Sequence, residues 1–363
     1  MGELSGQYDV VIVGGGPGGC ATALRLKQLA PQATILLLER GRYPRHKVCG
    51  EFVSAEGVAV LLRLSPLFMT LVAGRPTLDR GRIFAERNEA ALPLPNAAVS
   101  IPRYELDNAL WTVCGEIGIE CQARYPASEI EGKGPFVVSI NGERVQVGVV
   151  VDASGRWSNI SRRSSSNGEK WLGVKAHFRE ARPDDSVGLY FFEGGYCGVQ
   201  PVSDDAVNAC AMVRSDRATS IKDVLRLNSA LAQRSATWEP MMEEVTTAPL
   251  IFEHPCPWRD GIFRVGDAAG FIDPFVGDGI TLALLSGELA AESVATMLNA
   301  ETALETAGQK YAAAYQSRLA PLFKRASWLR RLMRMPRVAR VATMWVMGFG
   351  LVGRSLARVT RPA

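Results

Sequence analysis

Three of the five glycines between residues 14 and 19 have the spacing of a loop that binds nucleotide phosphates. The chain reads Gly14-Gly15-Gly16-Pro17-Gly18-Gly19 directly after the apolar, β-branched run of residues 8–13. In such a loop Gly14 allows a tight turn, Gly16 lets the backbone approach a pyrophosphate, and Gly19 lets the following helix pack closely on the strand. The N-terminus of that helix offers free N–H groups to the anion. The sequence therefore predicts dinucleotide binding at this loop, Pro17 and Gly18 included.

A carboxylate stands where a ribose would need one. The apolar strand predicted over residues 34–38 ends at Glu39, about twenty residues after the last glycine, where an acid accepts hydrogen bonds from the 2′- and 3′-hydroxyls of an unphosphorylated ribose. The neighbouring Arg40 is counted with the predicted binding site. At this point FAD and NAD fit equally well.

Two later strand ends carry further polar motifs. The predicted strand 145–151 ends in Asp152-Ala153-Ser154-Gly155, and residues 261–265 lead into Gly266-Asp267. The chain then continues through Gly277-Asp278-Gly279-Ile280 into a long predicted helix. Together with the glycine loop, these motifs resemble the FAD-dependent family of group A aromatic hydroxylases, flavin halogenases and geranylgeranyl reductases. The resemblance covers residues 1–295 and favours FAD, with Asp152 in its binding site.

The resemblance implies roles for three more places. Asp267 would bind a ribityl hydroxyl, and the helix that begins near Gly279-Ile280 would point its positive end at the flavin, where it stabilises the anionic reduced ring. The segment 101–107 is similar to the family's R-x-x-x-D pattern. By that likeness Arg103 meets the cofactor, and Asp107 caps the following helix.

A loop with a cysteine resembles one branch of the family most closely. Lys47-Val48-Cys49-Gly50-Glu51 is similar to the K-x-C-G segment of geranylgeranyl-reductase-like proteins, where this loop lies along the isoalloxazine ring. The resemblance implies that Cys49 and Gly50 contact the flavin. The alternative is that Cys49 is a small, buried apolar residue, as free cysteines often are.

The segment from residue 170 to 248 alternates as antiparallel strands do, for example over 187–192 and 207–213. In the family such a sheet covers the flavin and carries the substrate pocket, which makes Tyr196 a candidate pocket residue. A tyrosine packed into the sheet is equally compatible with the sequence. Residues 196–201 read Tyr-Cys-Gly-Val-Gln-Pro in place of the halogenases' W-x-W-x-I-P, so a flavin halogenase is a minor alternative. No catalytic residue is assigned.

The predicted fold class is α/β. A Rossmann-like FAD-binding domain would be assembled from residues 1–76, 100–165 and 255–295, and an antiparallel β-sheet substrate domain from residues 77–99 and 166–254. Residues 296–363 would form a basic, helical C-terminal region.

The predicted function is that of an FAD-dependent oxidoreductase, of monooxygenase or oxidase type, with a hydrophobic or carrier-bound substrate. The alternative is reduction of carbon–carbon double bonds in a lipid, as in geranylgeranyl reductases, and a non-catalytic binding protein of the same fold is a third possibility. Because no second strand-glycine-helix unit occurs, NAD(P)H is expected to bind transiently, or a partner reductase to supply electrons. Arg45 and His46 are candidates for receiving a nicotinamide phosphate.

Composition and charge limit the setting of the protein. The 363 residues include seven scattered cysteines without a C-x-x-C pair and only three histidines, which predicts a reducing cytoplasm and no metal site.

Twelve of the 41 lysines and arginines follow Glu305, where no acidic residue occurs. This tail predicts contact with a membrane surface, a lid over the pocket, or packing on the core. No nucleic-acid module is recognisable, and the oligomeric state is left open.

Overall fold

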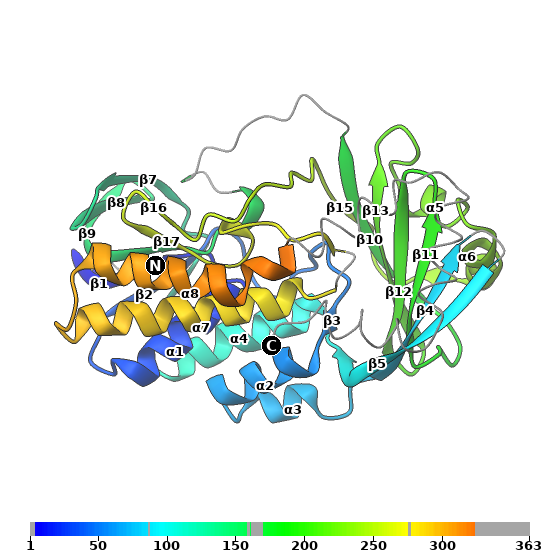
Figure 1. The fold of residues 1–363 in the computed structure, drawn as a ribbon, viewed down its shortest axis with the longest axis horizontal. Helices are drawn as coiled ribbons and strands as arrows, with labels where there is room; N and C mark the ends of the chain where they lie inside the picture. The colour runs from blue at the N-terminus through cyan, green and yellow to red at the C-terminus, as the bar shows by residue number, and fades with distance from the viewer. Residues whose placement is uncertain (1–3, 86–87, 158–159, 161–169, 275–276, 324–363) are drawn as a thin grey trace.

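The computed structural model describes residues 4–85, 88–157, 160, 170–274 and 277–323. Within these residues the chain forms two β-sheets side by side, with helices packed mainly on the first (Figure 1). The predicted α/β fold class is confirmed. The basic tail after Glu305 is described as far as residue 323, where Leu319, Leu322 and Phe323 pack in the core. The remainder of the tail, and the predictions that concern it, lie outside the described residues.

The first sheet contains the strands that a dinucleotide fold requires. Its main path is β16 (Trp258–Arg259), β17 (Ile262–Arg264), β9 (Glu143–Asp152), β1 (Gln7–Val13), β2 (Ile35–Glu39) and β6 (Glu120–Ala123), and β8 (Phe136–Ile140) and β7 (Ala127–Gly132) continue from β9. From β17 to β6 every neighbouring pair is parallel. Parallel strands end at the same sheet edge, so the motifs after β1, β2, β9 and β17 are brought together there.

Central strand β1 shows why the N-terminal segment folds as it does. Val10, Val11 and Ile12 have no exposed surface, because the strand lies between β2 and β9 and is covered on both faces. A strand buried on both sides needs a continuous apolar run rather than an alternating one. The hairpin before β9 turns at Asn141 and Gly142, both with positive φ, as its Asn-Gly sequence predicts.

Helices cover the first sheet and set the entry to its carboxyl edge. They are α1 (Pro17–Leu29), α2 (Ala55–Leu64), α3 (Phe68–Val72), α4 (Arg103–Glu116), α7 (Gly279–Leu298) and α8 (Leu304–Arg318), together with the 3-10 turns η1 (Gly155–Trp157) and η3 (Gly266–Ala268). Helices α1 and α7 touch at glycine: a Cβ on Gly287 would lie 2.5 Å from the carbonyl oxygen of Gly18. Although α7 is long and apolar enough to cross a membrane, most of it is buried in this core.

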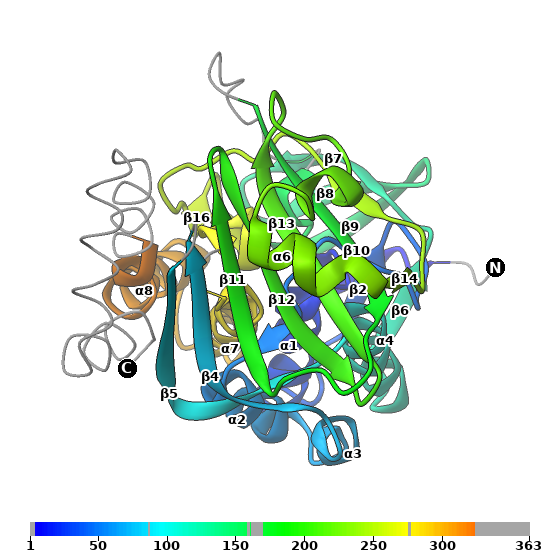
Figure 2. The same cartoon turned by 90° about the vertical axis from the view of Figure 1, so that its right-hand side faces the viewer.

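The second sheet lies against the carboxyl edge of the first (Figures 1 and 2). Its path is β14 (Glu239–Pro240), β10 (Trp171–Arg179), β13 (Ala206–Arg214), β12 (Gly195–Ser203), β11 (Ser186–Phe192), β4 (Thr77–Ala85), β5 (Asn88–Ser100) and β3 (Phe52–Val53), with β15 (Val245–Thr247) also on β10. It is antiparallel except where β4 and β11 pair in parallel. The expected antiparallel sheet is thus a mixed one.

Each face of the second sheet has its own environment. Alternate residues such as Val174, Ala176 and Phe178 pack in an apolar cluster with residues of the short helices α5 (Ile221–Val224) and α6 (Ser229–Arg234), beside η2 (Ser235–Thr237). Figure 2 shows α6 lying over this outer face. The opposite face is turned toward the first sheet.

Candidate functional site

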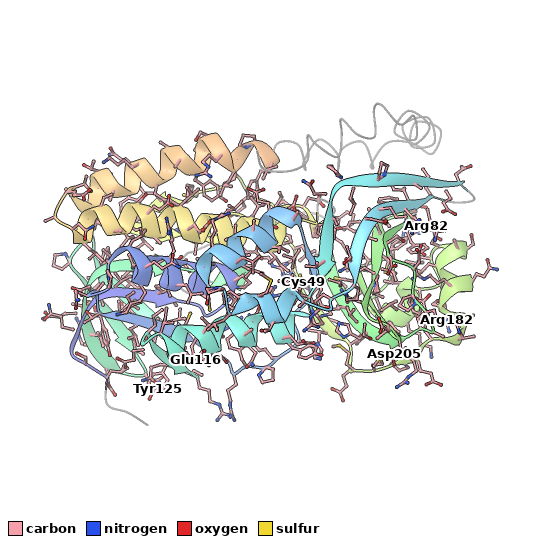
Figure 3. All side chains as sticks on the ribbon, turned by 90° about the horizontal axis from the view of Figure 1, so that it is seen from below. Cys49, Arg82, Glu116, Tyr125, Arg182 and Asp205 are labelled. Atoms are coloured by element: carbon pink, nitrogen blue, oxygen red, sulfur yellow. The ribbon has the colours of Figure 1, made fainter. Side chains whose placement is uncertain are left out.

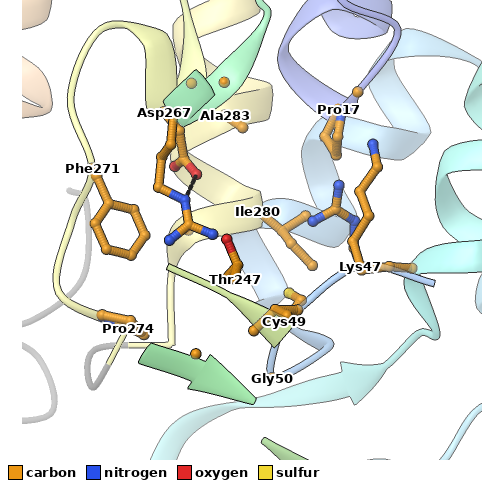
Figure 4. A pocket seen from close by; sticks show the side chains of 18 of the residues that line it. Pro17, Lys47, Cys49, Gly50, Thr247, Asp267, Phe271, Pro274, Ile280 and Ala283 are labelled. Carbon is orange, nitrogen blue, oxygen red and sulfur yellow. Dashed lines mark ion pairs between the residues drawn. The ribbon is translucent and has the colours of Figure 1, made fainter. Parts of the chain in front are cut away.

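A large cavity lies between the carboxyl edge of the first sheet and the inner face of the second. Its volume is about 610 Å³, within the range of roughly 300–1,000 Å³ typical of small-molecule and cofactor sites. Cys49 lies between the two parts of the molecule (Figure 3), and Figure 4 shows Pro17, Lys47, Cys49 and Asp267 around the cavity. Segments far apart in sequence therefore meet at one place.

The three motif glycines of the loop have two different environments: two are packed against backbone atoms and one is open to the cavity. Gly14 has φ +116°, and a Cβ there would lie 2.3 Å from the carbonyl oxygen of Ala153. A Cβ on Gly19 would lie 1.9 Å from the carbonyl oxygen of Gly14. At Gly16 the nearest atom would be Nζ of Lys47, at 3.9 Å. The first and third glycines are thus required by the protein itself, whereas the second leaves bare backbone facing the cavity.

Glu39 ends β2 beside this loop, where its carboxylate is almost completely buried. Oε2 accepts from the backbone N–H of Gly15 at 3.2 Å and the hydroxyl of Tyr43 at 3.1 Å, and Oε1 accepts from Gly41 N at 2.9 Å and Arg45 at 2.7 Å. Burial alone would raise the pKa of Glu39, but the charges of Lys47 and Arg45 outweigh it and lower the pKa. The group is an ionised acceptor, and a ribose would have to share it with these donors.

Arg103, Asp107 and Lys47 form an ion network at the start of α4. Nε and Nη2 of Arg103 reach the two carboxylate oxygens of Asp107 at 2.7 and 2.8 Å, and Nζ of Lys47 lies 2.7 Å from Oδ2. Asp107 has no exposed surface. Burial would raise its pKa, but the two cations outweigh that effect and hold the pKa below its usual range.

The prediction that Asp107 caps this helix is wrong. Helix α4 begins at Arg103 after Pro102, so Asp107 sits one turn inside it, where its side chain cannot reach the first free N–H groups. The backbone N–H of Arg103 instead donates to Oε1 of Glu51 at 2.8 Å. Asp107 points inward, where it supplies the counter-charge for two half-buried cations.

The loop with the cysteine lines the cavity between the two sheets. Cys49 is half-buried, and its sulfur interacts with the guanidinium of Arg103. A Cβ on Gly50 would meet no atom within 4 Å, so this glycine also presents bare backbone. Nδ2 of Asn208 on β13 holds the loop by donating to the carbonyl oxygens of Cys49 and Gly50 at 3.0 and 2.9 Å.

Another part of the cavity wall is formed by η3 and the start of α7. Asp267 in η3 lies 3.6 Å from Nε of Arg156, whose guanidinium packs 4.4 Å from the ring centroid of Phe271 (Figure 4). Helix α7 begins at Gly279 without a side-chain cap, and a Cβ on Gly279 would meet nothing within 4 Å. Its N-terminal N–H groups border the cavity beside Ile280.

Most residues predicted to bind the cofactor converge on this cavity. Those that line it are Gly14, Gly16, Pro17, Gly18, Glu39, Arg40, Cys49, Gly50, Arg103, Asp267, Gly279 and Ile280. Gly19 and Asp152 do not. Gly19 lies against Gly14, and the Asp152 carboxylate accepts from the backbone N–H of Ser154 at 3.0 Å. These two support the loops instead of facing the cavity.

Tyr196 belongs to the opposite wall. It is 5% exposed, packs with Met212 and Leu250, and lines the cavity. The two expectations for this residue therefore hold together, because the ring is packed in the sheet and also borders the pocket. Burial raises the pKa of its phenol well above the usual value. The rest of this wall is largely apolar and includes Phe52, Ile83, Val187, Leu189, Met212 and Leu250.

A buried polar cluster behind the cysteine loop, formed by Glu51, Lys175 and His177, was not predicted from the sequence. Lys175 and His177 on β10 contact the carboxylate of Glu51, which is itself completely buried. The available signal was a lysine and a histidine two residues apart in an otherwise apolar strand. His46, a candidate for receiving a nicotinamide phosphate, packs against Tyr104 and His177 with ring centroids 4.7 and 5.2 Å away.

The cavity has the features that FAD needs. Gly16, Gly50 and Gly279 expose backbone that no protein atom packs against closely, which leaves room for a ligand. The N-termini of α1 and α7 both border the cavity without side-chain caps, and such ends favour negative groups such as a pyrophosphate or a reduced flavin. The residues present therefore fit a long dinucleotide with a flavin ring.

Comparisons with known proteins agree with this fit. No family model matches the chain. It is 25% identical over 343 residues to digeranylgeranylglycerophospholipid reductase 3 of Methanosphaera stadtmanae, with 88% of this chain and 85% of the relative covered. It is 23% identical over 318 residues to the 1H-pyrrole-2-carbonyl-[peptidyl-carrier protein] brominase of Pseudoalteromonas luteoviolacea, with 79% and 77% covered.

A solved flavin-dependent brominase has the same fold. It matches with a TM-score of 0.78 and 19% identity, over 98% of this chain and 93% of the brominase.

Proposed function

This chain belongs to the superfamily of FAD-dependent oxidoreductases that includes geranylgeranyl reductases and flavin halogenases, and we propose that it uses FAD to reduce a carbon–carbon double bond in a hydrophobic substrate. The observation that carries the proposal is the shared cavity, in which the nucleotide loop, the cysteine loop and an apolar sheet wall face one another. Cofactor and substrate would thus occupy neighbouring parts of one site.

The chain's residues would divide the binding of FAD among three segments. Gly16, Pro17 and Gly18 with the N-terminus of α1 would hold the pyrophosphate, and Glu39 the ribose, with Arg40 beside it. Asp267 would bind the ribityl chain, while Cys49, Gly50 and Arg103 would lie along the ring. The start of α7 at Gly279-Ile280 would favour negative charge on the flavin. When bound, FAD supplies the hydride that the protein's side chains cannot supply.

The substrate side favours a neutral, apolar molecule. Its wall includes Ile83, Leu189 and Leu250, and the cations Lys47 and Arg103 are both paired with Asp107 on the cofactor side. Such a wall excludes water from the reacting groups. A lipid-like chain, or the apolar head of a carrier-bound molecule, fits these properties. The names of the archaeal reductase and of the carrier-protein brominase support these two substrate classes.

Reduction of a double bond also needs a proton donor on the side opposite the hydride. Tyr196 lies on the sheet wall across the cavity from the glycine loop. Its phenol is protonated at neutral pH and carries a proton that can be donated; burial raises the pKa of this phenol, which makes it a weak acid, so its place in the cavity and not its pKa carries the assignment. Tyr196 is therefore the proposed donor, and the product would gain two hydrogens.

Oxygenation of the same substrate is the second candidate, and the apolar wall favours it as well, because an oxygen-reactive flavin must be kept from water. In either reaction NAD(P)H would reduce the flavin from a transient site or through a partner protein. Cytoplasmic location and peripheral contact of the basic tail with a membrane remain predictions.

Mass spectrometry of products separates these functions. The purified protein should bind FAD and turn yellow, and bleach with NADPH or dithionite. After anaerobic reduction it would be mixed with a polyprenyl lipid or a carrier-bound acyl substrate, with and without an oxygen pulse. A product with two added hydrogens, formed without oxygen, supports reduction. A product with one added oxygen, formed only after the pulse, supports oxygenation. A protein that binds no FAD would refute both.

A further inference from the structure

Glu51 combines a buried charge with an unusual backbone conformation. Its φ is +63°, in the left-handed region that non-glycine residues seldom adopt, and its side chain has no exposed surface. Such a conformation persists only where the surrounding contacts over-determine it. The residue directly follows Cys49 and Gly50, so the conformation fixes the end of the cysteine loop.

The carboxylate of Glu51 joins three parts of the fold. Oε1 accepts from the backbone N–H of Arg103 at 2.8 Å, at the start of α4, and from Nζ of Lys175 on β10. Oε2 lies 2.7 Å from Nε2 of His177, also on β10. The backbone adds two further bonds, from Glu51 N to the Cys49 sulfur at 3.3 Å and from Ile101 N to Glu51 O at 3.0 Å. The loop is thereby tied to both domains.

The alternation of β10 explains why these partners face the loop. Val174, Ala176 and Phe178 point into the apolar cluster on the outer face, so Lys175 and His177 must point to the inner face. His177 is directly opposite Asn208 on β13. Asn208 in turn donates to the carbonyl oxygens of Cys49 and Gly50. The same part of this sheet face therefore binds the loop backbone through Asn208 and the Glu51 carboxylate through Lys175 and His177.

Stability alone does not account for this cluster. Removing charges from water costs free energy that an ion pair often fails to recover, and apolar residues of similar size would pack as well or better. Burial would raise the pKa of Glu51, but the hydrogen bond from His177 and the charge of Lys175 outweigh it and lower the pKa. The carboxylate is therefore ionised and fully engaged, and it acts through its neighbours, not on a substrate.

We propose that Glu51, together with Asn208, is the positioning residue that fixes Cys49 and Gly50 against the cavity, with Lys175 and His177 as its anchors on the second sheet. This inference rests on the proposed function only in explaining why the loop is fixed: a fixed loop would position the flavin ring. The positioning itself exists without the cofactor and can be tested without it.

The test measures the reactivity of the Cys49 thiol in FAD-free protein. Wild type, Asn208→Ala and Glu51→Gln would be treated with iodoacetamide, and the alkylation rate of each cysteine followed by peptide mass spectrometry. Cys256 is also half-buried and lies outside the cavity, so it serves as the internal reference. Glu180→Gln is the matched control, because Glu180 pairs with Arg234 at 2.9 and 3.0 Å at the other face of the sheet.

Both loop variants should raise the rate at Cys49 relative to Cys256 by roughly three- to tenfold, the factor expected from one lost hydrogen bond. Glu180→Gln should leave this ratio unchanged. Equal ratios in wild type and Asn208→Ala would overturn the proposal, whether or not Glu51→Gln folds. General destabilisation would raise both rates together and also count against it.

A second measurement separates this inference from the proposed function. With FAD added, the loop variants should shift the visible absorption bands or the reduction potential of the flavin, and Glu180→Gln should not. If wild type binds no FAD but the Cys49 ratio still rises in the variants, the flavin site is refuted while the positioning role stands.

Discussion

Arg103 and Asp107 form a two-point ion pair one helical turn apart, in which Asp107 is fully buried and the half-buried Arg103 borders the cavity. Lys47 meets the same carboxylate from the cysteine loop at 2.7 Å. One acid therefore balances two cations that come from different segments. Asp107 itself does not line the cavity, so the order of this site depends on a charge that lies behind its wall.

Asp107→Asn should be strongly destabilising. Neutralising the acid leaves the partly buried Arg103 and Lys47 without their counter-charge. Breaking a buried pair costs about 3–5 kcal/mol, and because these two cations keep some exposure we expect a loss toward the lower end of that range. Urea denaturation of the FAD-free protein measures the loss in the free energy of unfolding. Glu131→Gln, which breaks the exposed pair with Arg144, should change it little. Equal midpoints for the two variants would contradict the assigned role of Asp107.

Gly16→Ala should weaken FAD binding without unfolding the protein. The added Cβ fits the free protein, since its nearest neighbour would be Lys47 Nζ at 3.9 Å, but it would occupy space next to the pyrophosphate. We expect at least about a tenfold higher Kd by fluorescence titration, the equivalent of roughly 1.4 kcal/mol, with an unchanged melting temperature. Gly19→Ala is the contrast, because its Cβ would lie 1.9 Å from Gly14 O and should lower stability instead. Tight FAD binding by Gly16→Ala would rule out this path for the pyrophosphate.

Stability should fall in acid. Glu39, Glu51 and Asp107 all have pKa values lowered in the folded protein. Their stabilising contributions are therefore complete above the unfolded pKa values, 4.5 for glutamate and 3.8 for aspartate, and are lost as the pH falls through the lower folded values. Unfolding measured from pH 7 down to pH 3 should show this loss, with a shallower slope in Glu51→Gln. A flat profile in wild type would show that folding does not lower the pKa values of these acids.

Tyr196→Phe should slow product formation by about 100-fold or more, the range for loss of a general acid, while the rate of flavin reduction by NADPH stays the same. The control is Tyr190→Phe, a tyrosine of the same sheet whose hydroxyl contacts Arg234 in the outer cluster. Single-turnover assays of reduced enzyme with substrate separate the two steps. Unchanged product formation in Tyr196→Phe would assign the proton to another group.

The local parts of this protein could be predicted from the order of its amino acids. The run before Gly14, the acid at Glu39 and the Gly279-Ile280 helix start could all be placed in advance, because each depends on backbone conformation and on strand ends a few residues away. The parallel order of the strands then brings these places to one sheet edge. The α/β class followed from the same short-range patterns.

The pairing of the buried charges could be seen only once the chain was folded. The expected helix cap at Asp107 is a buried ion pair, and Glu51 meets Lys175 and His177 across 124 and 126 residues of chain. No periodicity encodes such contacts, because they arise where two sheets close over a loop and exclude water. A charge read along the sequence looks exposed until the fold buries it, and burial is what forces it to find a partner.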